Sequence, residues 1–286
     1  MLELIIDGIT FGLLLSLLGV GITLIFGLGE ILNLAHGEFA VICAMLALIF
    51  MERGVNTLLS IILGLLITGL IGLALERSLI SLVYRARGET RILLGIFITF
   101  GLSLAIHSYL VNTIPKAFFF SVKLPSEAIR IGGLIIRPST LLSAVISVLA
   151  LVLLEVFLKK TYTGKAIRAI AQDEMDAQLC GVNPAPLRTL VFILGAVMAG
   201  LAGILYGLIA TVAVIIGVDF TLLALIVAIV GGVRSIYGNI LSGVILGIVH
   251  TIASFFLGAY LSLVILLSVT IIIILTRPEG ILGEKG

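Results

Sequence analysis

The chain has 286 residues, of which 61% are hydrophobic and 11% charged, and its formal net charge is +2. A mean hydropathy of +1.36 and repeated apolar runs of about 18 or more residues exclude a soluble domain. They indicate an all-α, polytopic membrane protein, and the near balance of charge gives no support for binding nucleic acid.

The first apolar run begins almost at the first residue, and MLELIIDGIT lacks the basic region of a cleavable signal peptide. We therefore expect this first span to be retained. About 20 apolar residues are needed to cross a bilayer, and short or glycine-broken runs leave the expected count at eight or nine spans. The candidate spans are residues 4–26, 34–51, 57–75, 92–111, 140–158, 189–216, 221–233, 240–257 and 259–276, with 34–51 and 221–233 the least secure.

Glycine is abundant, with 32 residues. Pairs at G-x-x-x-G spacing occur at Gly8 and Gly12, at Gly203 and Gly207, and at Gly243 and Gly247. Small residues at this spacing let helices approach closely in lipid, where apolar burial gives no drive for association. We expect these pairs to pack helices within one subunit, with an interface between subunits as the alternative.

Two polar, glycine-containing breaks interrupt the apolar runs. The first places Glu30 ahead of a cluster whose members are Asn33, His36, Gly37 and Glu38, and the second begins at Gly231 and Gly232. Non-helical backbone at membrane depth is tolerated only where protein or a water-filled cavity satisfies it. Broken helices in the two halves of a chain are a pointer to the substrate path of a transporter, so both breaks are candidates for that path.

Orientation follows from basic residues in short loops. Arg77, Arg85, Arg87 and Arg91 crowd one loop, and residues 159–188 contain five further basic residues, so both loops are expected to be cytoplasmic. The segment from Asn112 to Arg137 then lies outside, although it carries four basic residues. With nine spans, the N-terminus is expected outside and the C-terminus inside.

The longest polar interruption, residues 159–188, predicts two short helices joined by a turn. Ile167 and Ile170 share one face of the first helix, while Asp173 is suited to cap the second helix, with Glu174 in its first turn. Gly181 is suited to the C′ position, and Pro184 and Pro186 follow it. The segment is either an ordinary connector or a docking surface for a cytosolic partner, on which Ile167, Met175, Ala177 and Leu179 are exposed.

Catalytic motifs are absent from the sequence. Gly164 and Lys165 do not complete a phosphate-binding loop, because the glycine needed five residues earlier is Lys159. His36, His107 and His250 have no partners at metal-ligand spacing, which predicts interhelical hydrogen bonds rather than a metal site. No chain of buried acids suited to a proton relay is evident, which counts against a proton-driven transporter. We therefore expect neither an enzyme nor a cofactor bound by this chain.

Several motifs together resemble those of the H-type permease subunit of branched-chain amino-acid ABC importers. They run in order over essentially the whole chain. They are Gly21-Ile-Thr-Leu-Ile-Phe-Gly, Asn33-Leu-Ala-His-Gly-Glu-Phe, Glu76-Arg77 with Tyr84-Arg85, Arg168-Ala-Ile-Ala-Gln-Asp with Ala177, Leu179, Gly181, Val182 and Asn183, Gly231-Gly232 with Ser235 and Gly238, and Arg277-Pro-Glu-Gly-Ile-Leu-Gly.

The resemblance implies a multi-pass permease of the cell membrane that pairs with a second permease, homologous or identical. It also implies two cytosolic ATPases, which hold ATP and Mg²⁺, and an extracytoplasmic solute-binding protein. In that family the loop corresponding to residues 161–183 holds the short coupling helix that docks on the ATPase. The residues that carry this expectation here are Gly164, Lys165, Ile167, Arg168, Ile170, Asp173, Glu174, Ala177, Leu179 and Gly181.

The sequence departs from the family pattern at two places. Met175, Asp176 and Ala177 stand where Glu, Ala and Ala are usual, and the second break carries Arg234, Tyr237 and Asn239 in place of Gly, Pro and Ala.

Residues 1–286 are expected to form one permease domain. The alternatives are a permease specific for urea or short amides, a secondary transporter or channel that works without ATPases, and a membrane scaffold that transports nothing.

Overall fold

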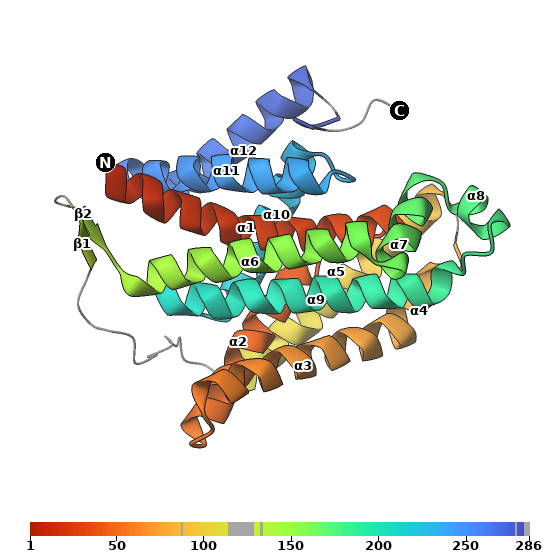
Figure 1. Ribbon diagram of the computed structural model, residues 1–286, viewed down its shortest axis with the longest axis horizontal. Coiled ribbons are helices and arrows are strands. Elements are labelled where there is room, and N and C mark those ends of the chain that lie inside the picture. Colours follow the sequence, from red (N-terminus) through yellow and green to blue (C-terminus); the bar gives the residue numbers. More distant parts are fainter. Residues whose placement is uncertain (87, 114–128, 132–133, 278, 283–286) are drawn as a thin grey trace.

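The computed structural model describes residues 1–86, 88–113, 129–131, 134–277 and 279–282, which form helices and one small hairpin (Figure 1). The predicted helical membrane bundle is confirmed. Its long helices are α1 (Leu2–Gly29), α2 (His36–Glu52), α3 (Thr57–Leu75), α5 (Glu89–Thr113), α6 (Pro138–Lys160), α9 (Pro184–Ile209), α10 (Ile216–Gly231), α11 (Ile236–Leu257) and α12 (Ala259–Thr276). The short elements are the π-helical turn η1 (Glu76–Ile80), α4 (Ser81–Val83), α7 (Tyr162–Gln172), α8 (Glu174–Leu179), β1 (Ile129–Ile131) and β2 (Leu134–Ile136).

Seven of the described helices are long and apolar enough to cross a membrane, with η1 and α4 extending α3 as far as Val83. The helices α2 and α10 have 17 and 16 residues, and they correspond to the two spans that the sequence left least secure. The observed helices are consistent with the eight or nine predicted spans.

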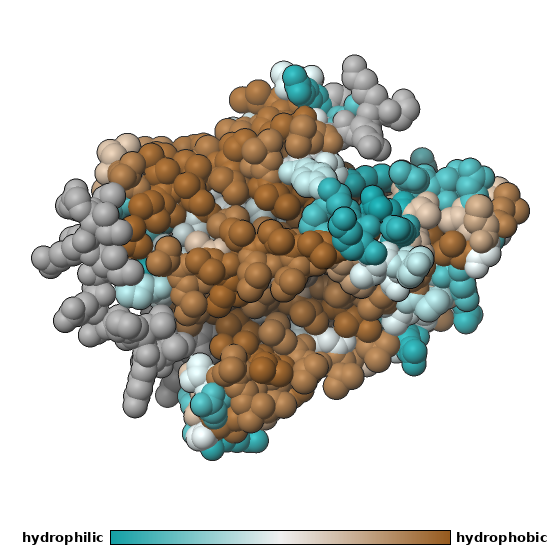
Figure 2. Space-filling model, viewed as in Figure 1, coloured by the Kyte–Doolittle hydropathy of each residue, from teal (hydrophilic) through white to brown (hydrophobic). Residues whose placement is uncertain are grey.

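The helix α1 forms the centre of the bundle and packs against α6, α9, α10 and α11 (Figure 1). It is apolar on all sides, as expected for a helix surrounded by other helices. In its most apolar window 78% of the residues are buried, compared with 17% for α5 and for α12. The outer helices therefore turn apolar side chains outward, and Figure 2 shows this apolar surface over the middle of the molecule.

Glycines of α1 and α11 let these two helices pack closely. A side chain at Gly12 would meet the backbone of Gly243 and Val244, and a side chain at Gly8 would meet Ile248. Next to them, the Ser16 hydroxyl donates to the carbonyl oxygen of Ile240 at 3.1 Å. The prediction that these glycines pack helices within one subunit is confirmed.

The two ends of the bundle differ. The N-terminus and the antiparallel β1–β2 hairpin, in which Ile129 pairs with Ile136, lie at one end, and α7 and α8 lie at the other (Figure 1). Hydrophilic residues gather at the α7–α8 end (Figure 2). Arg91 lies 3.9 Å from Glu174 there, so the two basic loops share one end, as their predicted orientation requires. Most of the loop predicted to lie outside falls on residues 114–128 and 132–133, which lie outside the described residues.

Candidate functional site

The segment between α6 and α9 folds into an elbow made of α7 and α8. Thr161 caps α7 by accepting a hydrogen bond from the Gly164 amide at 2.9 Å. A side chain at Gly164 would fall on the backbone of Phe157 and Leu158, so only glycine lets α7 fold back so closely on the end of α6. The elbow is therefore fixed to α6 by local structure.

Asp173 begins the second helix of the elbow, as predicted. Its carboxylate accepts hydrogen bonds from the amides of Met175 and Asp176 at 2.8 and 2.9 Å. After α8, Gly181 adopts a φ of 84°, a value that favours glycine, and Asn183 caps α9 by accepting from the Ala185 amide. Capping residues thus set the bounds of both short helices, and the predicted two-helix structure is confirmed.

The apolar side chains of the elbow divide between its inside and its surface. Ile167, Ile170 and Ala177 are buried, whereas Met175 and Leu179 are 74% and 81% exposed. The expectation that Ile167 and Ala177 are exposed was therefore wrong. Ile167 is buried because α7 is amphipathic and turns its apolar face to α6 and α9, whereas Ala177 is the buried residue of α8. Lys165 and Arg168 remain at the surface of α7.

A cluster of charged side chains ties the elbow to the spans. Arg188, in the first turns of α9, forms an ion pair with Glu174 at 2.5 Å, and its Nε donates to the carbonyl oxygen of Leu28 at 3.2 Å. The same guanidinium lies over the ring of Tyr84, 4.6 Å from its centroid. Burial raises the pKa of the Tyr84 hydroxyl, so that this partner stays neutral. The sequence indicated none of these pairings.

The cluster continues to α5 and to the turn between α10 and α11. Arg91 lies 3.7 Å from Glu30, and Arg234 lies 3.4 Å from the same carboxylate. Glu30 itself has a φ of 52°, the left-handed region that non-glycine residues seldom adopt. We name Glu30, Arg91, Glu174, Arg188 and Arg234 the charged cluster. Through it, the elbow contacts the ends of α1, α5, α9 and the α10–α11 turn.

The break between α1 and α2 is satisfied by its own side chains and by α5. The Asn33 side chain accepts from the Ala35 amide at 3.1 Å. The Thr99 hydroxyl of α5 accepts from the Leu34 amide and donates to the Leu32 carbonyl oxygen, each at 3.0 Å. Backbone groups inside a membrane need such partners, and these permit the helix to stop here.

The first residues of α2 pack without free space. His36 is fully buried, and a side chain at Gly21 would meet its imidazole ring. The Gly37 amide donates to the Thr221 hydroxyl of α10 at 2.8 Å, and a side chain at Gly37 would fall on the carbonyl oxygen of Gly217. The predicted cluster therefore lies where α2 meets α1 and α10.

Glu38 is fully buried and faces α5. Its Oε1 accepts from the Ser103 hydroxyl at 3.4 Å and lies 3.7 Å from Nδ1 of His107. Its Oε2 is directed toward Gly217 and has no hydrogen-bond partner among the described residues. The sequence predicted an interhelical hydrogen bond for His107 without naming a partner, but Nδ1 of His107 forms no hydrogen bond among the described residues. A possible signal was the four-residue spacing of Ser103 and His107, which places both on one face of α5.

The second break is packed by the C-terminal segment. Gly232 has a φ of 101°, and a side chain at Gly280 would meet its backbone. The Ile281 amide donates to the Val230 carbonyl oxygen at 2.8 Å. The structure therefore brings Gly280 and Ile281 of the C-terminal motif to the Gly231-Gly232 motif, a contact that the sequence did not indicate. The Glu30–Arg234 pair joins the edges of the two breaks.

Asn239, one of the departures from the family pattern, is buried on α11 behind the second break. Its side-chain amide donates to the Thr23 hydroxyl at 2.6 Å and to the Ser235 carbonyl oxygen at 2.7 Å. The polar residue is thus used to join α11 to α1. Among the residues that the structure describes, no group of three or more His, Cys, Asp or Glu side chains is arranged to hold a metal ion.

Comparison with known proteins places these features in a family. The family described as "Branched-chain amino acid transport system / permease component" matches residues 4–275. The high-affinity branched-chain amino acid transport system permease protein LivH of Salmonella typhimurium is 29% identical over 299 residues, which cover 99% of this chain and 96% of the relative. BraD of Pseudomonas aeruginosa is 27% identical with the same coverage. The probable permease protein LivH of Methanocaldococcus jannaschii is 27% identical, covering 98% of this chain and 92% of the relative.

Among solved structures, PsaBC from Streptococcus pneumoniae in complex with Fab is similar to this chain. The superposition has a TM-score of 0.53 and covers 96% of this chain and 91% of that chain, with 14% sequence identity. At this identity the likeness concerns the fold.

Proposed function

The chain belongs to the branched-chain amino acid transport permease family, and from this premise we propose that it is the membrane subunit of an ATP-driven importer for branched-chain or related amino acids. The described helices and the inner-membrane character of its relatives make it a multi-pass membrane protein. In this proposal the chain is not an enzyme. ATP and Mg²⁺ are bound by two cytosolic ATPase partners, a second permease completes the pathway, and an extracytoplasmic binding protein delivers the solute.

One observation supports the ATPase contact most directly. Met175 and Leu179 are almost fully exposed on a six-residue helix that stands out from the polar end of the bundle (Figure 1). Exposed apolar patches rimmed by polar residues mark protein–protein contact sites, and methionine is enriched at such interfaces. Ile167, Ile170 and Ala177 of the elbow are already buried within the chain. Met175 and Leu179 are therefore the side chains that we assign to the ATPase.

The charged cluster supplies the connection that coupling requires. A motion of the ATPases must reach the spans through contacts that persist during the motion, since a loop without such contacts would absorb it. Glu174 lies inside the elbow, one residue from the exposed Met175, and is paired with Arg188 of α9. In our proposal α8 moves with the ATPase, and the ion pairs transmit that motion to α1, α5 and α9.

For the substrate path we propose the region where the first break meets α5 and α10. Polar side chains inside a membrane are costly and occur where function requires them. Glu38 retains an unpartnered oxygen, and its neighbour His107 lies on α5, an outer helix with few buried residues. We place Asn33, His36, Gly37 and Glu38 at this path, with Gly231 and Gly232 as a packed turn at its edge.

The decisive experiment compares Leu179→Asp with Gln172→Asp in the complete importer. Both variants add one negative charge to an exposed position of the elbow, but only Leu179→Asp places it on the apolar contact. We expect Leu179→Asp to insert normally, lose most of its copurifying ATPase and lose ATP-driven uptake. Gln172→Asp should keep both. Normal uptake by Leu179→Asp would refute the ATPase contact.

The energy source of uptake distinguishes a secondary transporter or channel from the proposed ATP-driven importer. Uptake by the proposed importer stops when ATP is removed and continues in the presence of an uncoupler. Uptake that collapses with the proton gradient and needs no ATPase chain would favour the alternative. The solute that copurifies with the binding protein distinguishes an amino acid from urea or a short amide.

A further inference from the structure

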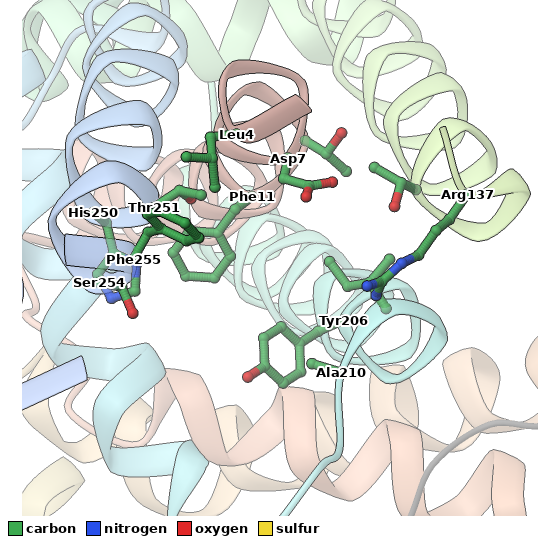
Figure 3. Close-up of a pocket in the computed structure, with 13 residues that line it drawn as sticks. Leu4, Asp7, Phe11, Arg137, Tyr206, Ala210, His250, Thr251, Ser254 and Phe255 are labelled. Carbon is green, nitrogen blue, oxygen red and sulfur yellow. The ribbon is translucent and has the colours of Figure 1, made fainter. Parts of the chain in front are cut away.

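A cavity of about 400 Å³ opens at the end of the bundle opposite the elbow, apart from the site described above. Its walls come from the first turns of α1, the start of α6, the end of α9 and the end of α11 (Figure 3). Ligand pockets in proteins measure roughly 300–1,000 Å³, so this cavity has room for a small solute. By the orientation inferred from the basic loops, it faces the extracytoplasmic side.

Two opposite charges face this cavity. Asp7 of α1 and Arg137, the residue before α6, are directed into the same space (Figure 3). In the part of the chain that the structure describes, their side chains form no hydrogen bond or ion pair, with each other or with any other residue. In the charged cluster, by contrast, Arg188 pairs with Glu174 and Arg91 with Glu30. Asp7 and Arg137 are thus a separated pair of exposed charges that have no protein partner among the described residues.

The remaining wall of the cavity combines aromatic and aliphatic side chains with the hydroxyl groups of Thr10, Thr140, Thr251 and Ser254. The Phe11 ring lies 4.8 Å from the ring of His250 and 6.4 Å from the ring of Tyr206. Leu4 and Ile209 add aliphatic surface. A ligand that fits this arrangement carries an anionic group and a cationic group at one end and an apolar group at the other.

This chemistry is that of a free α-amino acid. A guanidinium binds a carboxylate through two parallel hydrogen bonds, and a carboxylate accepts hydrogen bonds from an ammonium group. A ligand with a single charge would leave either Asp7 or Arg137 without a partner while it reduced the hydration of both. A branched aliphatic side chain would contact the aromatic wall.

The cavity is also adjacent to the proposed substrate path. Tyr206, which lines the cavity, packs edge to face against the buried ring of Phe220, with 5.0 Å between the ring centroids. The next residue, Thr221, accepts the hydrogen bond from the Gly37 amide. The Tyr206–Phe220 pair therefore separates the cavity from the polar break that contains Glu38.

We propose that this cavity is an entrance site for a zwitterionic amino acid, with Arg137 binding the α-carboxylate, Asp7 binding the α-ammonium group, and Phe11 and Tyr206 contacting the side chain. The inference rests on the proposed function, because it takes the amino-acid class of the solute from there. It adds a defined site to the permease itself, on the side that receives the solute.

The test measures the binding of radiolabelled leucine to the full permease–ATPase complex in nanodiscs, without binding protein. Two competitors probe the charges, namely leucinamide, which lacks the carboxylate, and 4-methylpentanoate, which lacks the ammonium group. We expect the wild-type complex to bind leucine and to prefer it to both competitors. Arg137→Gln should weaken leucine binding about 10- to 100-fold, which is the effect of losing one hydrogen-bonded charge. This variant should bind leucinamide and leucine with similar affinity. Asp7→Asn should likewise no longer prefer leucine to 4-methylpentanoate.

The matched controls are Arg53→Gln and Glu52→Gln, which remove the same charges from exposed positions at the turn between α2 and α3, outside the cavity. Arg137→Lys retains the charge and should recover part of the affinity, which separates a lost contact from a damaged fold. The proposal is overturned if the wild-type complex does not bind leucine, if Arg137→Gln behaves like Arg53→Gln, or if affinity falls without the predicted change in competitor preference.

Failure of this inference can be told from failure of the proposed function. If the wild-type importer accumulates leucine at the expense of ATP while Arg137→Gln and Asp7→Asn bind and transport leucine like the controls, only the entrance site is refuted. If no ATP-driven uptake occurs but leucine binding shows the predicted competitor pattern, the proposed function is refuted and the site remains.

Discussion

Two polar regions of this protein, the charged cluster beside the elbow and the buried break before α2, are stabilised in different ways. In the charged cluster, long side chains from different elements pair at the polar end of the bundle, and several of them are partly exposed. In the break, short polar side chains satisfy nearby backbone, and glycines let the helices close around them. The first arrangement tolerates small movements, whereas the second depends on contacts without free space.

The difference follows from the solvent around each region. Near water, an ion pair that separates is hydrated again, so its net contribution is small and its geometry can vary. Inside the bundle, a polar group that loses its partner pays the full cost of desolvation. A region that must move with a partner is therefore better built from the first kind of contact. The buried break is better suited to fixing where a helix begins.

The largest effect is expected from a methyl group added inside the break. Gly37→Ala would place Cβ on the Gly217 carbonyl oxygen and close to Thr221, and backbone cannot move aside as a side chain can. Overpacking of this kind costs about 1–3 kcal/mol and often more. The matched control is Gly101→Ala, since a side chain at Gly101 of α5 meets nothing within 4 Å. Both changes gain similarly in helix propensity.

Thermal denaturation and the yield of monodisperse protein in detergent measure this difference. We expect Gly101→Ala to denature at or slightly above the wild-type temperature. Gly37→Ala should denature well below it or fail to accumulate. Equal stability of the two variants would show that α2 and α10 are not in the close contact described above.

Local signals in the sequence predicted the helices well. The bounds of α3 and α12 are those predicted from the apolar runs, because Asn56 and Gly258 mark their beginnings. The capping role of Asp173 and the left-handed Gly181 were also predicted from residue type alone. Each of these features depends on neighbours within a few residues.

Contacts between distant segments could not be predicted in this way. Helices such as α1 are apolar on every side, so their sequence does not indicate which face meets which neighbour. The partners of Glu38 lie more than 60 residues further along the chain, and Arg188 reaches Leu28 from a position 160 residues later. The exposed positions of Met175 and Leu179, and the burial of Ile167, depend likewise on how the elbow rests on α6 and α9.

An intermediate effect is expected from Arg188→Gln in the charged cluster. The Arg188 side chain is 9% exposed, and its loss removes the nearest cationic partner of Glu174 and the side-chain donor to the Leu28 carbonyl oxygen. Removing one member of such a hydrogen-bonded charged pair costs about 1–3 kcal/mol. We expect a lower denaturation temperature than that of Lys160→Gln, which removes a charge from an exposed position at the end of α6. If the two variants were equally stable, the cluster would not hold the elbow in place.

The smallest effect is expected from Arg234→Gln. The side chains of Arg234 and Glu30 are 59% and 40% exposed, so their pair at 3.4 Å is largely hydrated. Such surface pairs contribute about 0–1 kcal/mol, and salt screens them over roughly 10 Å at 0.1 M. The variant should therefore lower the denaturation temperature only at low salt, and by less than Arg188→Gln does. A decrease in denaturation temperature that equals that of Arg188→Gln and persists in 1 M salt would mean that the exposed edge of the cluster behaves like buried structure. The contrast between the two polar regions would then not extend to the α10–α11 turn.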